Sequence, residues 1–193
     1  MVCLQLMNLI DRLFGVNVKK TLYIFIPLFC VIAYFSVALY SLTGSGIEDI
    51  IICSSDEGEA HYIPSVLCER YLLNYRATAD DVQALESNAG LSFLFGIQGD
   101  SKRYLYLDYF LSKGVSINAL SNVDGLTPLH AAIVLNDVEL VKYLLNKGAN
   151  PTQVDKNYAL TPLELSQKLD KARDPIKRSA ITDLIFAVAA KSE

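Results

Sequence analysis

Histidine and cysteine are the residues of this chain with the clearest capacity for metal or nucleophilic chemistry, and there are two His and four Cys. A structural zinc site needs four such ligands at short, regular spacing. Cys53 and Cys68 have no histidine partner at that spacing, and neither His61 nor His130 has suitable ligand neighbours. The sequence also lacks a glycine-rich phosphate loop, a Gly-x-Ser-x-Gly elbow and a His-Glu-x-x-His helix. We therefore expect no metal, no cofactor and no catalytic residue.

Acidic pairs and a tyrosine cluster are the remaining candidates for chemistry. Asp80–Asp81 occurs where a helix starts, which its positive end favours, and Asp56–Glu57 lies in a solvated polar segment. Tyr104, Tyr106 and Tyr109 lie in an apolar helical pattern, which favours packing over a platform for stacking nucleic-acid bases. The formal net charge of −4 gives no broad attraction for phosphates. Nucleic-acid binding is therefore not expected.

The N-terminal quarter contains a long apolar stretch, from Thr21 to Leu42, without Asp, Glu, Lys, Arg or His. At about 1.5 Å per residue it spans about 33 Å as a helix, which matches a hydrocarbon core about 30 Å thick. A buried core helix rarely runs this long without a charge. A cleavable signal peptide has a shorter apolar stretch and ends at small residues, whereas this one ends at Tyr40-Ser41-Leu42. We interpret residues 21–43 as a transmembrane helix.

Flanking charges predict the orientation of this helix. Arg12, Lys19 and Lys20 precede it, opposed only by Asp11, and the first basic residue after it is Arg70. Several acidic residues lie between the helix and that arginine: Glu48, Asp49, Asp56, Glu57, Glu59 and Glu69. The positive-inside rule then places residues 1–20 in the cytoplasm and the rest outside, which in a Gram-negative bacterium is the periplasm. The expected location is the cytoplasmic membrane, crossed once.

The cysteines fit this orientation. Cys3 would be cytoplasmic and Cys30 would lie in the membrane, while Cys53 and Cys68 would face an oxidising compartment. A bridge between Cys53 and Cys68 would close a short loop and add about 3 kcal/mol. Two unpaired thiols are the alternative, because the sequence does not show whether their Cα atoms come close enough.

A repeat occupies the C-terminal half. Leu126–Leu129 recurs 34 residues later as Leu160–Leu163, and Phe110–Gly114 recurs at the same offset as Leu144–Gly148. Within one unit, Thr127 caps a helix that has Pro at its first position. A second helix begins after Asn136-Asp137 and ends at the glycine at position 148. Such a period indicates stacked supersecondary units.

This unit resembles the ankyrin repeat. The segment DGLTPLHAAIVLNDVELVKYLLNKGANP, residues 124–151, carries the resemblance, and TPLH is its most specific part. The resemblance implies that His130 has a structural role, with its imidazole tying neighbouring loops together. In the next unit Glu164 replaces this histidine, and the insertion 170–177 displaces the second helix, so the unit is interpreted as a C-terminal cap. An earlier, degenerate unit has Ser92-Phe93-Leu94-Phe95 in place of TPLH.

The expected fold is all-α: a short ankyrin-repeat solenoid of about three repeats with caps, preceded by one transmembrane helix. Two helices, Ser65–Leu73 and one that starts after Thr78, are expected to cover the first repeat, because a short array needs terminal caps. The expected organisation is a cytoplasmic segment 1–20, the transmembrane helix 21–43, a polar acidic tether 44–60, an N-terminal helical cap 61–89, and repeats 90–122, 123–156 and 157–191 within 90–191.

Recognition is the function that remains. The resemblance implies a concave face made of loop tips and first helices, and a partner protein as ligand. The expected contact residues are Asn122, Val123, Asp124, Leu126, Val134, Leu135, Asn136, Gln153, Asp155, Asn157 and Tyr158. The sequence thus predicts a non-catalytic protein-recognition module in the membrane, and the more specific hypothesis is an immunity protein that neutralises a secreted toxin in the periplasm. The alternatives are an adaptor for an envelope complex and, from another class, an enzyme subunit.

Overall fold

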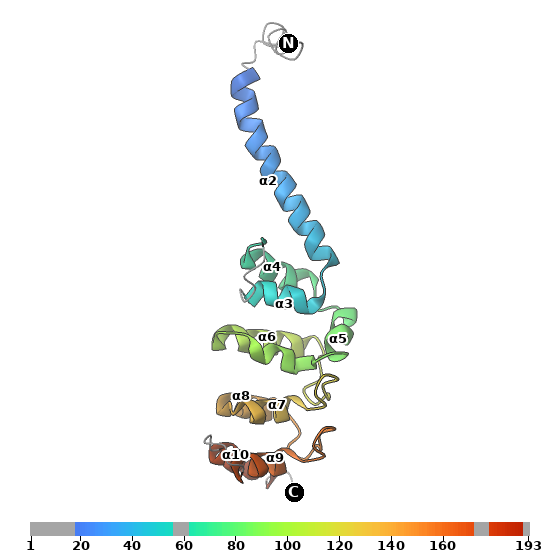
Figure 1. Ribbon diagram of the computed structural model, residues 1–193, viewed down its shortest axis with the longest axis vertical. Coiled ribbons are helices and arrows are strands. Elements are labelled where there is room, and N and C mark those ends of the chain that lie inside the picture. Colours follow the sequence, from blue (N-terminus) through green and yellow to red (C-terminus); the bar gives the residue numbers. More distant parts are fainter. Residues whose placement is uncertain (1–17, 56–61, 172–177, 191–193) are drawn as a thin grey trace. The chain divides into compact units, whose positions relative to one another are not determined.

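The computed structural model describes residues 18–55, 62–171 and 178–190, and all regular structure in these ranges is helical (Figure 1). The prediction of an all-α fold is confirmed. The chain divides into two compact units, Met1–Ser45 and Gly46–Glu193. His61, the pair Asp56–Glu57, residues 1–17 and most of the insertion 170–177 lie outside the described residues.

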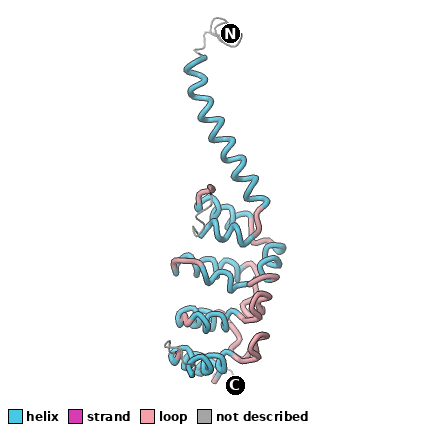
Figure 2. The backbone as a smooth tube through the Cα atoms, viewed as in Figure 1, coloured by secondary structure: helices cyan, strands magenta, loops and turns pink. Residues whose placement is uncertain are grey.

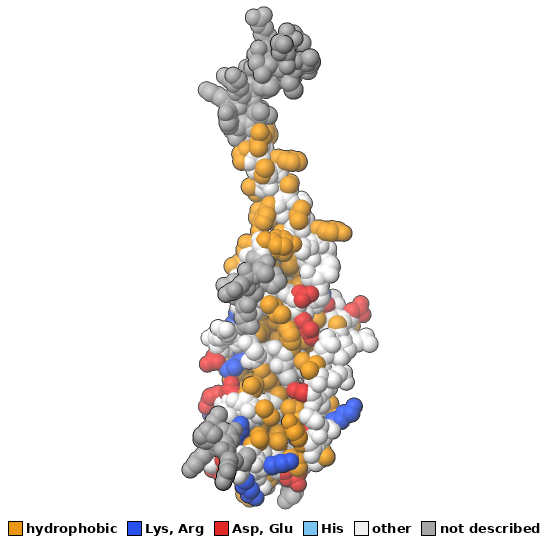
Figure 3. Space-filling model, in the orientation of Figure 1, with side chains coloured by type: hydrophobic (Ala, Val, Ile, Leu, Met, Phe, Trp, Pro, Cys, Tyr) orange, Lys and Arg blue, Asp and Glu red, His pale blue; other side chains and the backbone are white. Residues whose placement is uncertain are grey.

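In the first unit the described residues form one helix, α2, Val18–Gly44. Its stretch Phe25–Gly44 is long and apolar enough to cross a membrane, judged by length and composition. Large apolar side chains along it are exposed, among them Phe29 at 72%. On the face shown in Figure 3, the described part of α2 presents hydrophobic side chains and no charged one. Pro27 lies inside this helix, where its missing N–H removes one backbone hydrogen bond.

The second unit begins with a pair of packed helices, α3 (Ile47–Ser55) and α4 (Ser65–Tyr75). The expectation of a tether over 44–60 is therefore wrong for residues 47–55. The reason lies in Ile47, Ile50 and Ile51, which have helical spacing and are all buried. The acidic residues of this segment, which suggested a solvated tether, include Glu48 and Asp49 in the first turn of α3, where the helix dipole favours them.

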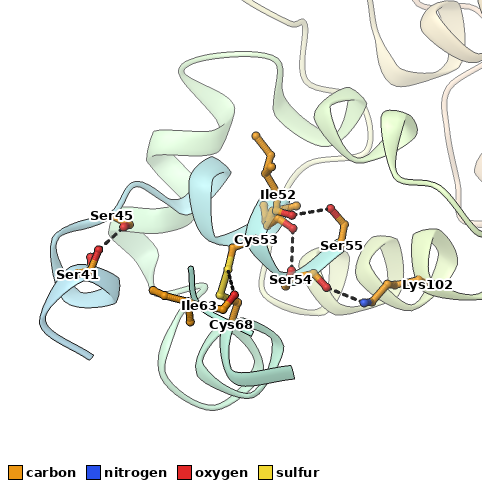
Figure 4. The surroundings of a disulfide bond; sticks show 10 residues. Ser41, Ser45, Ile52, Cys53, Ser54, Ser55, Ile63, Cys68 and Lys102 are labelled. Atoms are coloured by element: carbon orange, nitrogen blue, oxygen red, sulfur yellow. Dashed lines mark hydrogen bonds between the residues drawn. A yellow bond between two sulfur atoms is a disulfide. The ribbon is translucent and has the colours of Figure 1, made fainter. Parts of the chain in front are cut away.

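A disulfide joins the two helices of this pair. Cys53 of α3 and Cys68 of α4 are both buried, and their Cα atoms are 5.8 Å apart (Figure 4). Of the two alternatives that the sequence left open, the structure has the bridge. The carbonyl oxygen of Ser54 next to it accepts a hydrogen bond of 2.6 Å from the Lys102 ammonium, so the bridged pair is also tied to the first repeat.

Helix α5 (Ala79–Glu86) completes the N-terminal cap and starts at Thr78, as predicted. The Thr78 side chain accepts from the Asp81 N–H, and the Asp81 carboxylate accepts from the Thr78 N–H, which is a capping box. Arg76 also binds the Asp81 carboxylate, with the shortest N–O distance at 2.6 Å. Burial alone would raise the pKa of Asp81, but these hydrogen bonds lower it below its ordinary value. Asp81 is therefore a structural residue.

Three helix pairs follow and stack in chain order (Figure 1). They are η1 (Gly90–Gly96) with α6 (Asp100–Ser112), α7 (Pro128–Leu135) with α8 (Val138–Asn146), and α9 (Pro162–Lys171) with α10 (Ser179–Ala189). The two Leu-Thr-Pro-Leu segments open α7 and α9, as the repeat predicted. The segment at Ser92–Phe95 differs, because it forms a 3-10 helix. Its N-cap, Ala89, has no side chain to accept a hydrogen bond, whereas Thr127 caps α7.

The second helices of the first two repeats end in the same way. Gly114 and Gly148 have φ of 100° and 93°, in the left-handed region that favours glycine. The N–H of the following residue reaches back to the helix, from Val115 to Phe110 O at 3.1 Å and from Ala149 to Leu144 O at 2.9 Å. These bonds are those of the Schellman motif. The 34-residue period thus fixes helix ends as well as helix starts.

Replacing Gly148 by valine should lower the free energy of unfolding by at least about 1 kcal/mol, because an L residue, above all a β-branched one, resists this conformation. A Cβ at Gly148 meets no atom within 4 Å, so the effect is purely conformational. The matched control is Gly96→Val, which has equally open space and no positive φ. Chemical unfolding followed by circular dichroism measures both. Equal stability of the two variants would contradict the left-handed helix end.

Candidate protein-binding surface

Two loops precede the first helices of the last two repeats and stack on one another at the same ends of the helices (Figure 2). The two loops share an equivalent backbone hydrogen bond that closes them, from Ser121 N to Leu126 O at 2.9 Å and from Asp155 N to Leu160 O at 3.0 Å. The loops are also bonded to each other, because Lys156 N donates to Gly125 O at 2.9 Å. These bonds give the loop tips a fixed shape.

A buried polar residue shapes each loop from inside. In the second loop, the Asp155 carboxylate accepts from the backbone N–H groups of Tyr158 and Leu160. In the first loop, the hydroxyl of Ser121 takes this position. Burial would raise the pKa of Asp155, but the backbone hydrogen bonds lower it below its ordinary value. Asp155 was expected to touch a partner, and this expectation is wrong. Its side chain is buried, and both carboxylate oxygens accept hydrogen bonds from the loop backbone.

His130 ties the two loops to the first helix of the middle repeat. Its Nε2 lies 3.0 Å from Leu160 O, and its Nδ1 lies 2.7 Å from the Thr127 hydroxyl. A carbonyl oxygen only accepts, so Nε2 carries the proton and Nδ1 accepts from Thr127. The residue is fully buried, and burial lowers the pKa of His130 below its ordinary value, which keeps the ring neutral. The structural role that the resemblance implied for this histidine is confirmed.

The surface formed by the loops and first helices is hollowed in two places. The first hollow, which we call the inner groove, has a volume of about 320 Å³ and lies between η1, the first loop and α7, with Phe95, Val123 and Leu135 among its lining. The second, the tip groove, has about 430 Å³ and lies between the two loops, with Asn122, Lys156 and Asn157 among its lining. Both share Ser121, Val123 and Asp124, so they form one continuous surface.

The structure divides the expected contact residues into exposed and enclosed ones. Those that are exposed and line a groove are Asn122, Val123, Asp124, Val134, Leu135 and Asn157. Tyr158 is exposed, with the Lys168 ammonium 6.0 Å from its ring centroid, but lines neither groove. Val123 and Leu135 are the most exposed apolar members, at 74% and 58%.

The remaining residues that were expected to contact a partner have structural roles. Leu126 lines the inner groove but is only 6% exposed. Asn136 is the left-handed C-cap of α7, with φ of 56°, which asparagine tolerates well. Gln153 donates its amide to Asn118 O at 3.0 Å and links two repeats. Several turn residues in this fold form hydrogen bonds that join neighbouring loops. The sequence alone does not distinguish these residues from the turn residues whose side chains stay exposed.

Sequence reasoning missed the roles of three residues in this part of the structure. Phe95 was recognised only as an apolar residue of its helix, although its repeat position places it beside the inner groove. Glu164 accepts from Thr161 N at 2.8 Å and caps α9, which the spacing Thr-x-x-Glu could have indicated. Arg178, after the insertion, is buried and donates to the carbonyl oxygens of Ile133 and Val134 at the end of α7. No sequence signal points to this long-range contact.

Two further hollows lie away from the loop surface, one of about 530 Å³ between α6 and α8 and one of about 510 Å³ beside α9 and α10, and the described residues offer no metal site. None of their His, Cys, Asp and Glu side chains form a group of three or more that could hold a metal ion. The tyrosines of α6 pack, as predicted: Tyr106 is fully buried, and the Tyr104 ring lies 4.9 Å from that of Tyr143. The Tyr109 hydroxyl lies 3.0 Å from Leu72 O at the end of α4.

Stacked pairs of antiparallel helices, with loops projecting at one end and hydrogen-bonded from repeat to repeat, define a helical repeat solenoid. Residues 124–156 match the sequence model of the ankyrin repeat. The chain therefore contains an ankyrin repeat, and ankyrin repeats are typically non-catalytic modules for protein–protein interaction. Among curated proteins, no sequence matches the chain.

Proposed function

We propose that this chain is a non-catalytic receptor for another protein, held at the outer face of a cytoplasmic membrane by α2. The observation that carries the proposal is the continuous surface of the inner and tip grooves on two stacked ankyrin loops. Its inner groove exposes the apolar side chains of Val123 and Leu135, and its tip groove adds the polar side chains of Lys156 and Asn157. Protein interfaces combine buried apolar contacts with polar ones in this way.

Two observations support the outer location. The basic residues Arg12, Lys19 and Lys20 precede α2, while Glu48 and Asp49 follow it, which is the asymmetry of a cytoplasmic N-terminus. The buried Cys53–Cys68 disulfide also suits an oxidising compartment such as the periplasm.

The more specific proposal is an immunity protein, in which the surface caps a secreted toxin that reaches the periplasm. Anchoring supports this role, because a tethered inhibitor has a high effective concentration where the toxin acts. Cells that make the chain should then survive a toxin encoded by a neighbouring gene, and the double variant Val123→Ser, Leu135→Ser should protect less. Loss of an envelope complex, with survival unchanged, would instead favour an adaptor.

Site-specific cross-linking tests the surface directly. A photo-reactive amino acid at Val123 or Leu135 should cross-link to the partner protein in intact cells. The matched control is Lys142, which is exposed on α8 and outside both grooves. Equal cross-linking from Lys142 would show that the partner binds elsewhere.

The anchor makes its own prediction. The full chain should stay in the membrane fraction after washing with high salt or alkaline carbonate, because an apolar helix of this length is released only by detergent. Immunoblotting of the fractions measures this. A shortened, soluble species would identify α2 as a cleaved signal sequence. Added protease should reach residues after Gly44 only from the outer side, and protection there would reverse the proposed orientation.

A further inference from the structure

The last turn of α7 carries part of the inner groove. Val134 and Leu135 line this groove and are 43% and 58% exposed, so the packing of their own side chains does little to hold the turn in place. The helix is only eight residues long, and a helix as short as this is marginal in water without contacts from elsewhere. The position of these two side chains therefore depends on what binds the backbone of the turn.

The carbonyl oxygens at the C-terminal end of a helix lack partners within that helix. In α7 the Ile133 carbonyl oxygen accepts from Asn136 N at 3.1 Å. Arg178, at the start of α10, adds two bonds, from its Nε to Ile133 O at 3.2 Å and from its Nη2 to Val134 O at 3.3 Å. The negative end of the helix dipole also favours a guanidinium here. One side chain of the last repeat thus binds the turn that carries the groove wall.

Arg178 does not serve its own helix. It is the N-cap residue of α10, a position that favours Ser, Thr, Asp and Asn, and its side chain makes no capping bond there. At the same place before α8, Asp137 accepts from Leu140 N at 2.9 Å and caps the helix. Arg178 is only 5% exposed, and its backbone N–H donates to the Asp170 carboxylate of α9 at 2.8 Å. Its guanidinium is therefore held between the last repeat and α7.

We propose that Arg178 is a positioning residue for the partner-binding surface, which keeps Val134 and Leu135 in place at the wall of the inner groove. This inference rests on the proposed function. A guanidinium suits the task because its rigid fork of donors binds two neighbouring carbonyl oxygens at once, whereas an ammonium is a compact point charge. The consequence is that partner binding depends on the last repeat, although none of its described residues lines the inner groove.

Three variants of the full chain separate this role from a general contribution to folding. Arg178→Met keeps most of the aliphatic stem and removes the donors. Arg178→Lys keeps the charge but has a single ammonium in place of the fork. Lys171→Met is the matched control, because Lys171 is exposed at the end of α9. All three are compared with the natural chain.

Nuclear magnetic resonance of the chain in lipid nanodiscs, with isotope-labelled Val and Leu methyl groups, follows the groove wall itself. The signals of Val134 and Leu135 should shift in Arg178→Met and stay in place in Lys171→Met. The signals of Val123, on the loop, and of Leu140, buried in α8, should not shift in either variant. Unchanged signals at the groove wall would overturn the inference. Equal shifts at all four positions would also overturn it, because Arg178 would then only support the fold.

A photo-reactive amino acid at Leu135 measures the effect on binding in intact cells. Cross-linking to the partner should fall about five-fold in Arg178→Met, which corresponds to about one lost hydrogen bond, and recover in part in Arg178→Lys. From Val123 it should fall less. If the natural chain cross-links and Arg178→Met does so equally well, the inference is wrong and the proposed receptor stands. If the natural chain cross-links no protein from either position, the receptor and the inference both fail.

Discussion

Replacing Cys53 and Cys68 together by alanine is expected to lower the free energy of unfolding by about 3 kcal/mol. The bridge closes a loop with a sequence separation of 15. A cross-link of this span removes about 3 kcal/mol of chain entropy from the unfolded state at room temperature. Both side chains are also buried, so their loss removes some packing. Few single features of a chain of this size contribute as much to its stability.

Chemical unfolding of the full chain in detergent, with and without reductant, measures this effect. The reductant should bring the natural chain close to the double variant, while the variant itself should not respond. Cys30→Ser is the matched control, because Cys30 is exposed on α2 and not bonded. If the natural chain is equally stable in reductant, and its peptides carry free thiols by mass spectrometry, the bridge is absent.

The loss should propagate into the repeats. Lys102 of α6 binds the Ser54 carbonyl oxygen next to the bridge, and the Tyr109 hydroxyl lies against the carbonyl oxygens at the end of α4. In a solenoid each repeat is stabilised mainly by its neighbours, so loosening the α3–α4 cap exposes the apolar η1–α6 pair. Hydrogen exchange should therefore speed up first in α6 and only weakly in α10.

His130→Ala should be the second severe change, with a loss of about 2–4 kcal/mol. The substitution leaves the Leu160 carbonyl oxygen and the Thr127 hydroxyl without their buried partner, and it opens a cavity. It also breaks the side-chain bond between the middle repeat and the second loop. The same position in the last repeat, Glu164→Ala, is the matched control, and it should cost less because Glu164 is exposed and only caps its own helix.

The same histidine makes stability depend on pH. Because the pKa of His130 is lowered in the folded chain, the unfolded chain binds the proton first as the pH falls. The contribution is complete above the ordinary histidine value of about 6.5 and is lost progressively as the pH falls below it. Unfolding between pH 8 and 5 should show this slope in the natural chain and a smaller one in His130→Ala. Equal slopes in the two proteins would contradict the role of His130 in the pH dependence.

The exchange of histidine for glutamate in the last repeat changes what the side chain at this position binds. His130 reaches forward to the loop of the next repeat, where the Leu160 carbonyl oxygen lies 3.0 Å from its Nε2. Glu164 uses its carboxylate for the start of its own helix, with hydrogen bonds from Thr161 N and Thr161 Oγ1, both at 2.8 Å. At this position α9 is thus capped locally, whereas α7 is linked to the following loop.

Features that depend on local chemistry could be predicted from the order of the residues alone. The Thr-Pro helix starts, the glycine helix ends and the Thr78 cap could all be predicted, because capping and left-handed turns involve residues only a few positions apart. The 34-residue period then gave the solenoid, since each repeat has to bury its face against the next. The apolar length of α2 was equally visible.

What each polar or apolar residue faces depends instead on how the helices and loops pack together. Residues 47–55, which were expected to form a tether, form α3, because Ile47, Ile50 and Ile51 are buried where α3 packs against α4. Packing also encloses Asp155, which looks like any solvated turn residue until the loop closes around it. It also brings Arg178 to the end of α7, about 45 residues away in the chain. Burial and long-range pairing are properties of packed neighbours, and a residue's type and local spacing do not specify those neighbours.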